Sequence, residues 1–161
     1  LTRRALQQRT LKDAYAAAMA PPRASSRNLL LVDRHGGKVD VETTALEQSP
    51  TWGGDCLVHT NHYVNPEMLQ HERAVGVEYR NSVCRYQRME VILEANRGQI
   101  DLPVLKAAFR DHEGGADSIC VHPHESRSYQ TFASLIAVLA ERRLEIAKGP
   151  PCQYEYHTYR F

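Results

Sequence analysis

The predicted architecture rests on the segment Leu29-Leu30-Leu31-Val32-Asp33-Arg34-His35-Gly36-Gly37-Lys38-Val39-Asp40-Val41-Glu42-Thr43. Its first four residues are apolar, and Arg34-His35-Gly36-Gly37 supplies a turn. After the turn, Val39, Val41 and Thr43 alternate with polar residues. Two such runs around a glycine turn predict a β-hairpin, and the alternation predicts a second strand with one wet face or end.

A helix is predicted on the N-terminal side of this hairpin. Thr10-Leu11-Lys12-Asp13 resembles a capping box, in which Thr10 accepts from the amide three residues on. Apolar residues then recur at helical spacing, and Pro21-Pro22 ends the helix. On the other side, a loop containing Pro50 and Gly53-Gly54 leads to 56–59, predicted as a strand that delivers Thr60-Asn61-His62 at its end.

The C-terminal half predicts helices followed by strands. Ser82 is expected to cap a helix that runs to about Asn96, and Asp101-Leu102-Pro103 opens another. Residues 118–122 alternate and predict a strand. Residues 130–148 fit either an amphipathic helix or a hairpin of strands 131–139 and 144–146, which their continuous apolar character favours. Mixed hairpins and helix pairs predict an α+β fold, in one domain over residues 1–161.

The bulk properties are those of an ordinary globular protein. A net charge of +1 gives no electrostatic reason to expect nucleic acid or an anionic membrane as a partner. Apolar runs stay short of the ~20 residues that a membrane span needs. Four widely spaced cysteines form no CxxC pair and favour a reducing, cytoplasmic location. The chain begins at Leu1 without a methionine or secretory signal, which indicates a processed product or a fragment.

His59-Thr60-Asn61-His62 is the first candidate site. An asparagine at a strand end can hold its amide donors in a fixed direction, as stabilisation of a developing oxyanion requires. Alternatively, Asn61 satisfies turn backbone.

The second candidate is the run from Asn81 to Arg88. Arg85 and Arg88 lie three residues apart on a predicted helix, so two guanidinium groups could bind a carboxylate. The alternative is a solvated basic face that pairs with Glu90 and Glu94.

The third candidate combines Cys120-Val121-His122-Pro123-His124 with His112 and the His59/His62 pair. Cysteine and histidine are zinc ligands, but paired ligands in structural zinc sites are usually separated by two to four residues, so no metal ligands are assigned. A nucleophilic pair of Cys120 with His122 or His59 is also conceivable. The segment around Cys120 has no local signature of a cysteine protease.

The order of these segments carries a family resemblance. The ordered set is His59-Thr60-Asn61-His62-Tyr63, Ser82-Val83-Cys84-Arg85-Tyr86, Asp111-His112-Glu113-Gly114, Ser118-Ile119-Cys120-Val121-His122, Gln130-Thr131-Phe132-Ala133-Ser134 and Gly149-Pro150-Pro151-Cys152. It resembles the C-terminal part of the acyl-coenzyme A:6-aminopenicillanate acyltransferases, to which β-alanyl-dopamine hydrolase is also related. The resemblance covers nearly the whole chain.

The resemblance implies an αββα sandwich of the N-terminal-nucleophile hydrolase type, with 131–148 forming two central strands. It implies a precursor that cleaves itself before a cysteine, which then attacks an acyl carbonyl with its own α-amine as base. The matching oxyanion-hole residue is Asn61, Arg85 falls near a site-lining arginine, and Ser82 and His62 are candidate substrate contacts.

The nucleophile would belong to an upstream segment of the same precursor, so this chain alone is expected to be inactive. The expected substrate is a small-molecule amide or acyl thioester, with acyl-coenzyme A as a possible substrate and no cofactor. Two alternatives stay open. One is a non-catalytic, truncated homologue, and the other is a metal-binding module built on His59, His62, Cys120 and His122.

Overall fold

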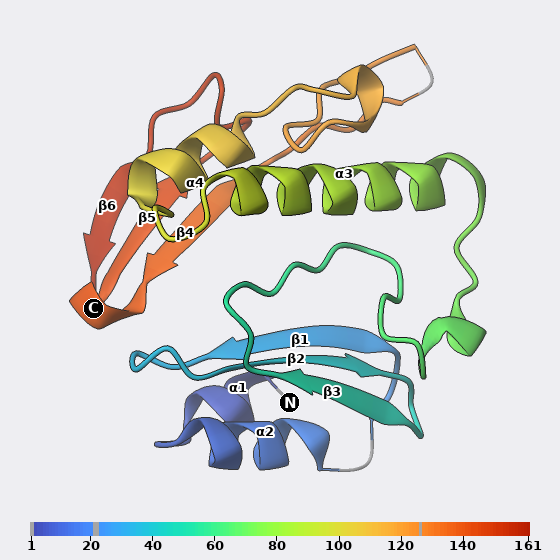
Figure 1. Cartoon of the computed structure of the whole chain (residues 1–161), viewed down its shortest axis with the longest axis vertical. Coiled ribbons are helices and arrows are strands. Elements are labelled where there is room, and N and C mark those ends of the chain that lie inside the picture. Colours follow the sequence, from blue (N-terminus) through green and yellow to red (C-terminus); the bar gives the residue numbers. More distant parts are fainter. Residues whose placement is uncertain (1, 21–22, 126) are drawn as a thin grey trace. The chain divides into compact units, whose positions relative to one another are not determined.

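The structure is a computed structural model that describes residues 2–20, 23–125 and 127–161. The chain forms two compact units, Leu1–Ala74 and Val75–Phe161 (Figure 1). The single domain expected from the sequence stays a prediction.

The first unit begins with two helices, α1 (Thr2–Leu6) and α2 (Leu11–Met19). The predicted cap is present, because the Thr10 hydroxyl oxygen accepts a hydrogen bond from the Asp13 amide at 3.1 Å. The helix predicted from Thr10 onward is therefore confirmed. The proline pair expected to end it lies outside the described residues.

The predicted hairpin is also confirmed. Strands β1 (Arg27–Val32) and β2 (Lys38–Thr43) pair antiparallel, and β3 (Gln48–Trp52) pairs with the far side of β2. Asp33 holds the turn by accepting hydrogen bonds from the amides of His35 and Gly37. The sequence did not predict β3. Its Pro50 indicated a loop, but an edge strand tolerates a proline because one side of its backbone needs no ladder partner.

The strand alternation divides this sheet into two chemically different faces. Leu29 lies opposite Val41, and Leu31 lies opposite Val39. These side chains pack with α1 and α2, which cover one face of the sheet (Figure 1). The buried centre of this core is Ala5, Ala18, Met19, Val39 and Val41.

The polar side chains on the opposite face of β2 are buried, whereas the sequence predicted that they would be exposed to solvent. Asp40 and Glu42 are only 5% and 2% exposed. The segment between β3 and η1 (Leu69–His71) runs over this face as an irregular loop (Figure 1). The strand predicted over 56–59 is therefore wrong. Further along this loop, the Glu42 carboxylate and not a neighbouring strand accepts the backbone amides of Val64 and Asn65.

The second unit contains two helices, α3 (Gly76–Ala95) and α4 (Leu102–Phe109). Helix α4 begins as predicted, with the Asp101 carboxylate accepting from the Val104 amide at 2.9 Å. Helix α3 begins earlier than predicted. Ser82 is not its cap but a buried residue of its second turn, because the helix already starts at Gly76.

Residues 118–122 do not form the predicted strand. They follow the short helix η2 (Gly115–Asp117) as an irregular segment. The Cys120 amide donates to the Asp111 carbonyl, and the Val121 amide donates to the Thr131 hydroxyl. The Thr131 amide donates back to the Val121 carbonyl, and these bonds to two different segments take the place of a ladder.

The hairpin preferred over a helix for 130–148 is confirmed. Strands β4 (Ser134–Val138), β5 (Arg143–Ala147) and β6 (His157–Arg160) form an antiparallel sheet, and η3 (Leu139–Glu141) joins the first two strands. Lys106 of α4 reaches Glu145 of β5 at 2.8 Å. The chain thus combines helices with two small antiparallel sheets, which is compatible with the α+β class.

Replacing Glu145 by glutamine is expected to destabilise the protein by about 2 kcal/mol at pH 7. Glu145 is 2% exposed and also accepts from the Thr158 hydroxyl. The hydrogen bond from Lys106 lowers the pKa of Glu145. The stabilisation is therefore present above the unfolded pKa, and the difference should shrink as the pH falls through the folded pKa. Urea unfolding of both proteins between pH 3 and 7 measures it; a pH-independent difference would contradict this account.

Candidate functional site

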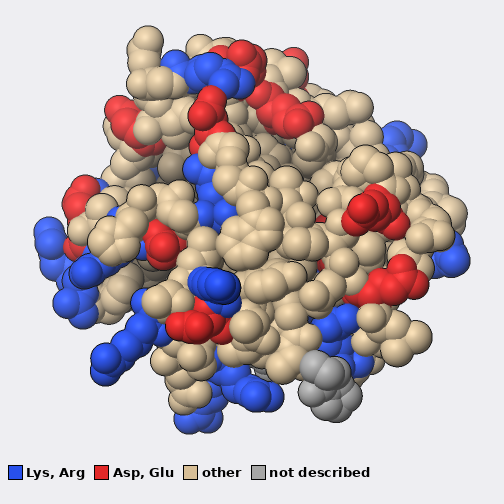
Figure 2. Space-filling model, turned by 60° about the horizontal axis from the view of Figure 1, so that its bottom comes forward, with Lys and Arg blue, Asp and Glu red and all other residues tan. Residues whose placement is uncertain are grey.

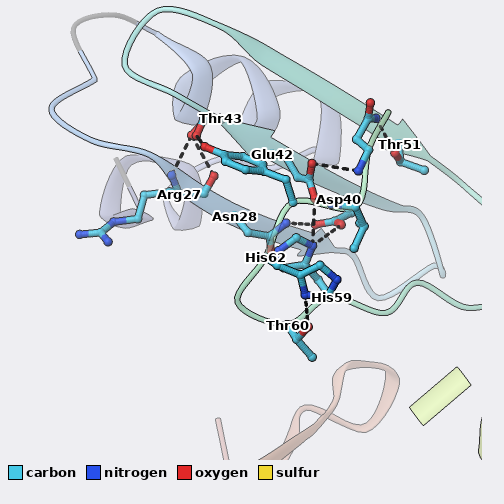
Figure 3. A network of polar contacts seen from close by, with 12 residues as sticks. Arg27, Asn28, Asp40, Glu42, Thr43, Thr51, His59, Thr60 and His62 are labelled. Carbon is cyan, nitrogen blue, oxygen red and sulfur yellow. Dashed lines mark hydrogen bonds and ion pairs between the residues drawn. The ribbon is translucent and has the colours of Figure 1, made fainter. Parts of the chain in front are cut away.

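The loop from His59 to Tyr63 lies over the polar face of the first sheet and borders a cavity of about 560 Å³. Figure 3 shows the side chains of His59 and His62 beside those of Asp40 and Glu42. All of the cavity lining comes from the first unit. It comprises Ser26, Arg27, Asn28, Leu30, Glu42, His59, Thr60, Asn61, His62, Tyr63 and Glu72.

Glu42 anchors this loop. One carboxylate oxygen accepts from the Val64 amide at 2.6 Å, and the other accepts from the Asn65 amide at 3.0 Å. Burial raises the pKa of Glu42, although these two amides and His59 oppose the shift. The buried Glu42 carboxylate therefore joins strand β2 to the loop at Val64 and Asn65.

His59 lies between two carboxylates. Its Nδ1 is 3.3 Å from Asp40 and 3.4 Å from Glu42, which are ion-pair distances without the alignment of a hydrogen bond. Asn28 donates its side-chain amide to the other oxygen of Asp40. This network holds His59 against the sheet (Figure 3). The His59 side chain is thus largely covered, about 10% exposed, and lies beside two carboxylates.

Tyr63 closes the far end of the loop. Its hydroxyl group donates to the Thr43 carbonyl at 3.0 Å, and its amide donates to the Glu72 carboxylate at 2.8 Å. Burial alone would raise the pKa of Glu72, but backbone amides led by that of Tyr63 outweigh it and lower the pKa. Both ends of the short segment that carries Asn61 are therefore fixed to buried groups.

Asn61 itself is exposed and borders the cavity. Next to it, His62 Nδ1 lies 3.2 Å from the Thr60 hydroxyl oxygen. The structure thus brings Asn61 and His62 together at the cavity, although a loop rather than a strand carries them. An exposed amide on a segment fixed at both ends can present donors to a bound carbonyl oxygen with little reorganisation.

Ser82 and Arg85 lie together on α3, in the second unit. Ser82 is 1% exposed, and Arg85 donates from Nε to the Asn81 side-chain oxygen at 3.0 Å. Burial lowers the pKa of Arg85, which Tyr129 partly offsets. The side-chain nitrogen of Asn81 is buried and has no hydrogen-bond partner among the described residues. The four predicted site residues therefore form one pair in each unit.

Arg88 has a different role from either alternative offered by the sequence. It binds the Asp111 carboxylate through two hydrogen bonds, at 2.7 and 3.1 Å, and lies 2.9 Å from Glu113. The hydrogen bond from Arg88 lowers the pKa of Asp111. Arg88 therefore fixes the segment after α4, and it is not a partner of Arg85 in binding a ligand carboxylate.

The structure also assembles four cysteine and histidine side chains that the sequence did not group. The ligand atoms of His112, Cys120, His122 and Cys152 all lie within 4.8 Å of one another. Three of them were singled out from the sequence, but Cys152 was not, because it lies 30 residues from His122 and only the fold joins them. His59 and His62, the other members of the suggested metal module, belong to the first unit.

Cys120 does not have the properties of an activated nucleophile. It is buried, and burial raises its pKa to about 11. A nucleophilic cysteine needs thiolate character at working pH, which usually means a lowered pKa. The pairing of Cys120 with His122 at 3.7 Å therefore does not describe a Cys–His catalytic dyad.

The molecular surface carries charges of both signs. Figure 2 shows basic and acidic side chains interspersed on the face drawn, as expected from a net charge of +1. Among the described residues, no helix combines the length and apolar character needed to cross a membrane.

Comparison with known proteins identifies the family. A family model described as acyl-coenzyme A:6-aminopenicillanic acid acyl-transferase matches residues 1–152. The match includes residues of both units and all four predicted site residues. No curated protein matches the chain significantly. The chain belongs to the acyl-coenzyme A:6-aminopenicillanic acid acyl-transferase family.

Proposed function

We propose that the complete protein transfers acyl groups from a thioester, or hydrolyses an amide, through a cysteine acyl-enzyme. The observation that carries this proposal is the family match over residues 1–152. The cavity beside Asn61 adds a place where a small molecule could bind. Family membership supports acyltransferase activity in general, and the steps below are the proposed mechanism.

The proposed nucleophile is an N-terminal cysteine, released when the precursor cleaves itself upstream of this chain. Its thiolate attacks the acyl carbonyl, and the tetrahedral intermediate expels the coenzyme A thiolate or an amine, which takes a proton from the cysteine's α-ammonium group. An acceptor amine or water then attacks the resulting thioester. The attacking amine or water passes a proton to the α-amine, and the cysteine leaves as its thiolate.

Asn61 is the proposed oxyanion donor of both steps. Its position between His59 and Tyr63, which are fixed to the sheet, supports this role because a pre-oriented amide needs no rearrangement when charge develops. His62 is a proposed substrate contact on the same loop. No cofactor is required by this mechanism.

Ser82 and Arg85 are the proposed substrate contacts of the second unit. The buried amide nitrogen of Asn81, without a partner among the described residues, lies on the same helix and supports a polar ligand there. A guanidinium group at Arg85 suits a substrate carboxylate. The proposed architecture of the complete protein is the αββα sandwich of the N-terminal-nucleophile hydrolase type.

Trapping the acyl-enzyme tests the mechanism. The complete protein would be mixed with acyl-coenzyme A in the absence of an acceptor amine, quenched in acid and digested for mass spectrometry. We expect one acyl group on a cysteine that is the N-terminus of its fragment, released by hydroxylamine. Prior alkylation of that cysteine should prevent labelling.

The second candidate function is a non-catalytic homologue that binds a ligand without turnover. It predicts binding of acyl-coenzyme A without a covalent adduct and without release of free coenzyme A. Adduct formation on an internal cysteine, such as exposed Cys56 or Cys152, would contradict the N-terminal nucleophile and leave only unspecific acylation.

A further inference from the structure

Four potential metal ligands converge in the second unit from three separate segments. His112 follows α4, Cys120 and His122 lie in the segment after η2, and Cys152 lies in the turn after β5. Three of these atoms form a triangle. Cys120 Sγ is 3.6 Å from Cys152 Sγ and 3.7 Å from His122 Nε2. The distance between His122 Nε2 and Cys152 Sγ is 3.1 Å. His112 Nε2 lies 3.1 Å from His122 Nε2.

These four distances are close to edges of a coordination tetrahedron, and the two remaining pairs, His112 with each cysteine, lie within 4.8 Å. Zinc binds cysteine sulfur at about 2.3 Å and histidine nitrogen at about 2.0–2.1 Å. A regular tetrahedron with those bond lengths separates two sulfurs by about 3.8 Å, sulfur and nitrogen by about 3.6 Å and two nitrogens by about 3.3 Å. Each of the four distances above is within about half an ångström of its ideal value.

Hydrogen bonds between the three segments support the arrangement of the ligands. The Cys120 amide donates to the Asp111 carbonyl at 3.0 Å, which joins the segments of Cys120 and His112. The Arg110 side chain donates to the Pro151 carbonyl at 2.7 Å, which brings the turn of Cys152 to the end of α4. Arg88 in turn fixes the Asp111 side chain. The convergence therefore does not depend on four freely rotating side chains.

We propose that His112, Cys120, His122 and Cys152 bind one zinc ion. The two cysteines bind as thiolates and release their protons to solvent, so the two thiolates neutralise the dication. Two histidines and two cysteines complete four-coordinate tetrahedral geometry, with no position left for water. The site is therefore structural and independent of the proposed chemistry at Asn61.

The surroundings explain what such an ion would do. Among the described residues from 110 to 133, regular structure is limited to η2 and an isolated bridge between His124 and Arg127. A zinc ion would link this irregular segment to α4 and to the turn after β5. Such a link stabilises a region that has few ladder hydrogen bonds of its own.

The competing outcome is a disulfide between Cys120 and Cys152. Their sulfur atoms are 3.6 Å apart, well beyond the about 2.05 Å of a bonded pair. A disulfide would also leave His112 and His122 without a role in the cluster. Both cysteines are free thiols in the structure.

The metal content of the complete protein, purified under reducing conditions without added metal or chelator, tests the proposal. We expect one zinc per chain by plasma mass spectrometry. Exchange for cobalt should produce the visible absorption of a tetrahedral ion together with thiolate-to-cobalt charge transfer. Chelation should lower the unfolding midpoint by roughly 10 °C.

Matched variants separate this site from adventitious binding. Cys152→Ser and His112→Ala should lose the stoichiometric zinc. The controls Cys56→Ser and His124→Ala should keep it, because both residues are exposed and lie outside the cluster. Reduced, folded wild-type protein that holds no zinc and gives no tetrahedral cobalt spectrum would overturn the proposal. A Cys120–Cys152 disulfide in metal-free protein, or zinc retained by both cluster variants, would do the same.

Discussion

Asn61→Ala in the complete protein is expected to reduce kcat/KM by about 10²–10³-fold while leaving the fold intact. The proposed role of Asn61 is to donate its side-chain amide to the oxyanion, an interaction that is strongest in the transition state. The loss should therefore fall mainly on kcat. Because Asn61 is exposed, the unfolding midpoint should change little.

Asn65→Ala is the matched control for this experiment. Asn65 belongs to the same loop, but its side-chain nitrogen lies 3.3 Å from the Thr51 hydroxyl oxygen and it does not line the cavity. Steady-state kinetics of both variants should show a large loss for Asn61→Ala and a small one for Asn65→Ala. Equal kinetics in wild type and Asn61→Ala would remove Asn61 from the mechanism.

Glu42→Ala is expected to lower the free energy of unfolding by about 4 kcal/mol. The substitution leaves the amides of Val64 and Asn65 without their acceptor and removes one of the two carboxylates beside His59. Glu47→Ala is the control, because the carboxylate of Glu47 is exposed and its pairing with His71 should contribute less than about 1 kcal/mol. Urea unfolding measures both, and similar small losses would contradict the anchoring role.

Glu42→Gln should change how stability depends on pH. Burial raises the pKa of Glu42 above the ordinary 4.5, although its bonds to the backbone amides of Val64 and Asn65 oppose the shift. For a raised pKa, the stabilising contribution is complete below the unfolded value and is lost as the pH rises through the folded value. The stability of Glu42→Gln relative to wild type should therefore increase with pH above about 4.5. A constant difference from pH 4 to 8 would contradict a raised pKa.

Elements with a strong local signal could be predicted from the sequence. The Thr10 cap, the glycine turn at 36–37 and the helix start at Asp101-Leu102-Pro103 each have a short-range reason, and all three are present. The hairpin at 134–147 followed from continuous apolar character, although the family resemblance supported the same choice.

The predicted strands at 56–59 and 118–122 failed for a shared physical reason. Both segments have a strand-like composition, but neither pairs with a neighbouring strand. The amides of Cys120 and Val121 bind the Asp111 carbonyl and the Thr131 hydroxyl, and the loop that carries 56–59 is bound at Val64 by the Glu42 carboxylate. Such long-range partners leave no periodic pattern in a single sequence. Glu42 illustrates this, since its alternating position predicted exposure and not burial under a loop.

The candidate sites show the same difference between residues found from local patterns and residues that only the fold brings together. Asn61 was found through an ordered set of segments, and its placement beside the cavity needed the fold. Cys152 had no recognisable ligand spacing, so the cluster with Cys120 and His122 emerged only from the arrangement of three separate segments. Arg85 and Arg88 looked equivalent at helical spacing, yet Arg88 binds Asp111 through two hydrogen bonds, whereas Arg85 donates to Asn81.

The central proposal is a self-processed enzyme with an N-terminal cysteine nucleophile. Its most direct test is the intact mass, under denaturing conditions, of the products made from the complete reading frame that encodes this chain. We predict two fragments, of which the one containing residues 1–161 begins with a cysteine, and no cleavage when that cysteine is replaced by alanine. A single uncleaved chain without a cysteine upstream of Leu1 would contradict the proposal.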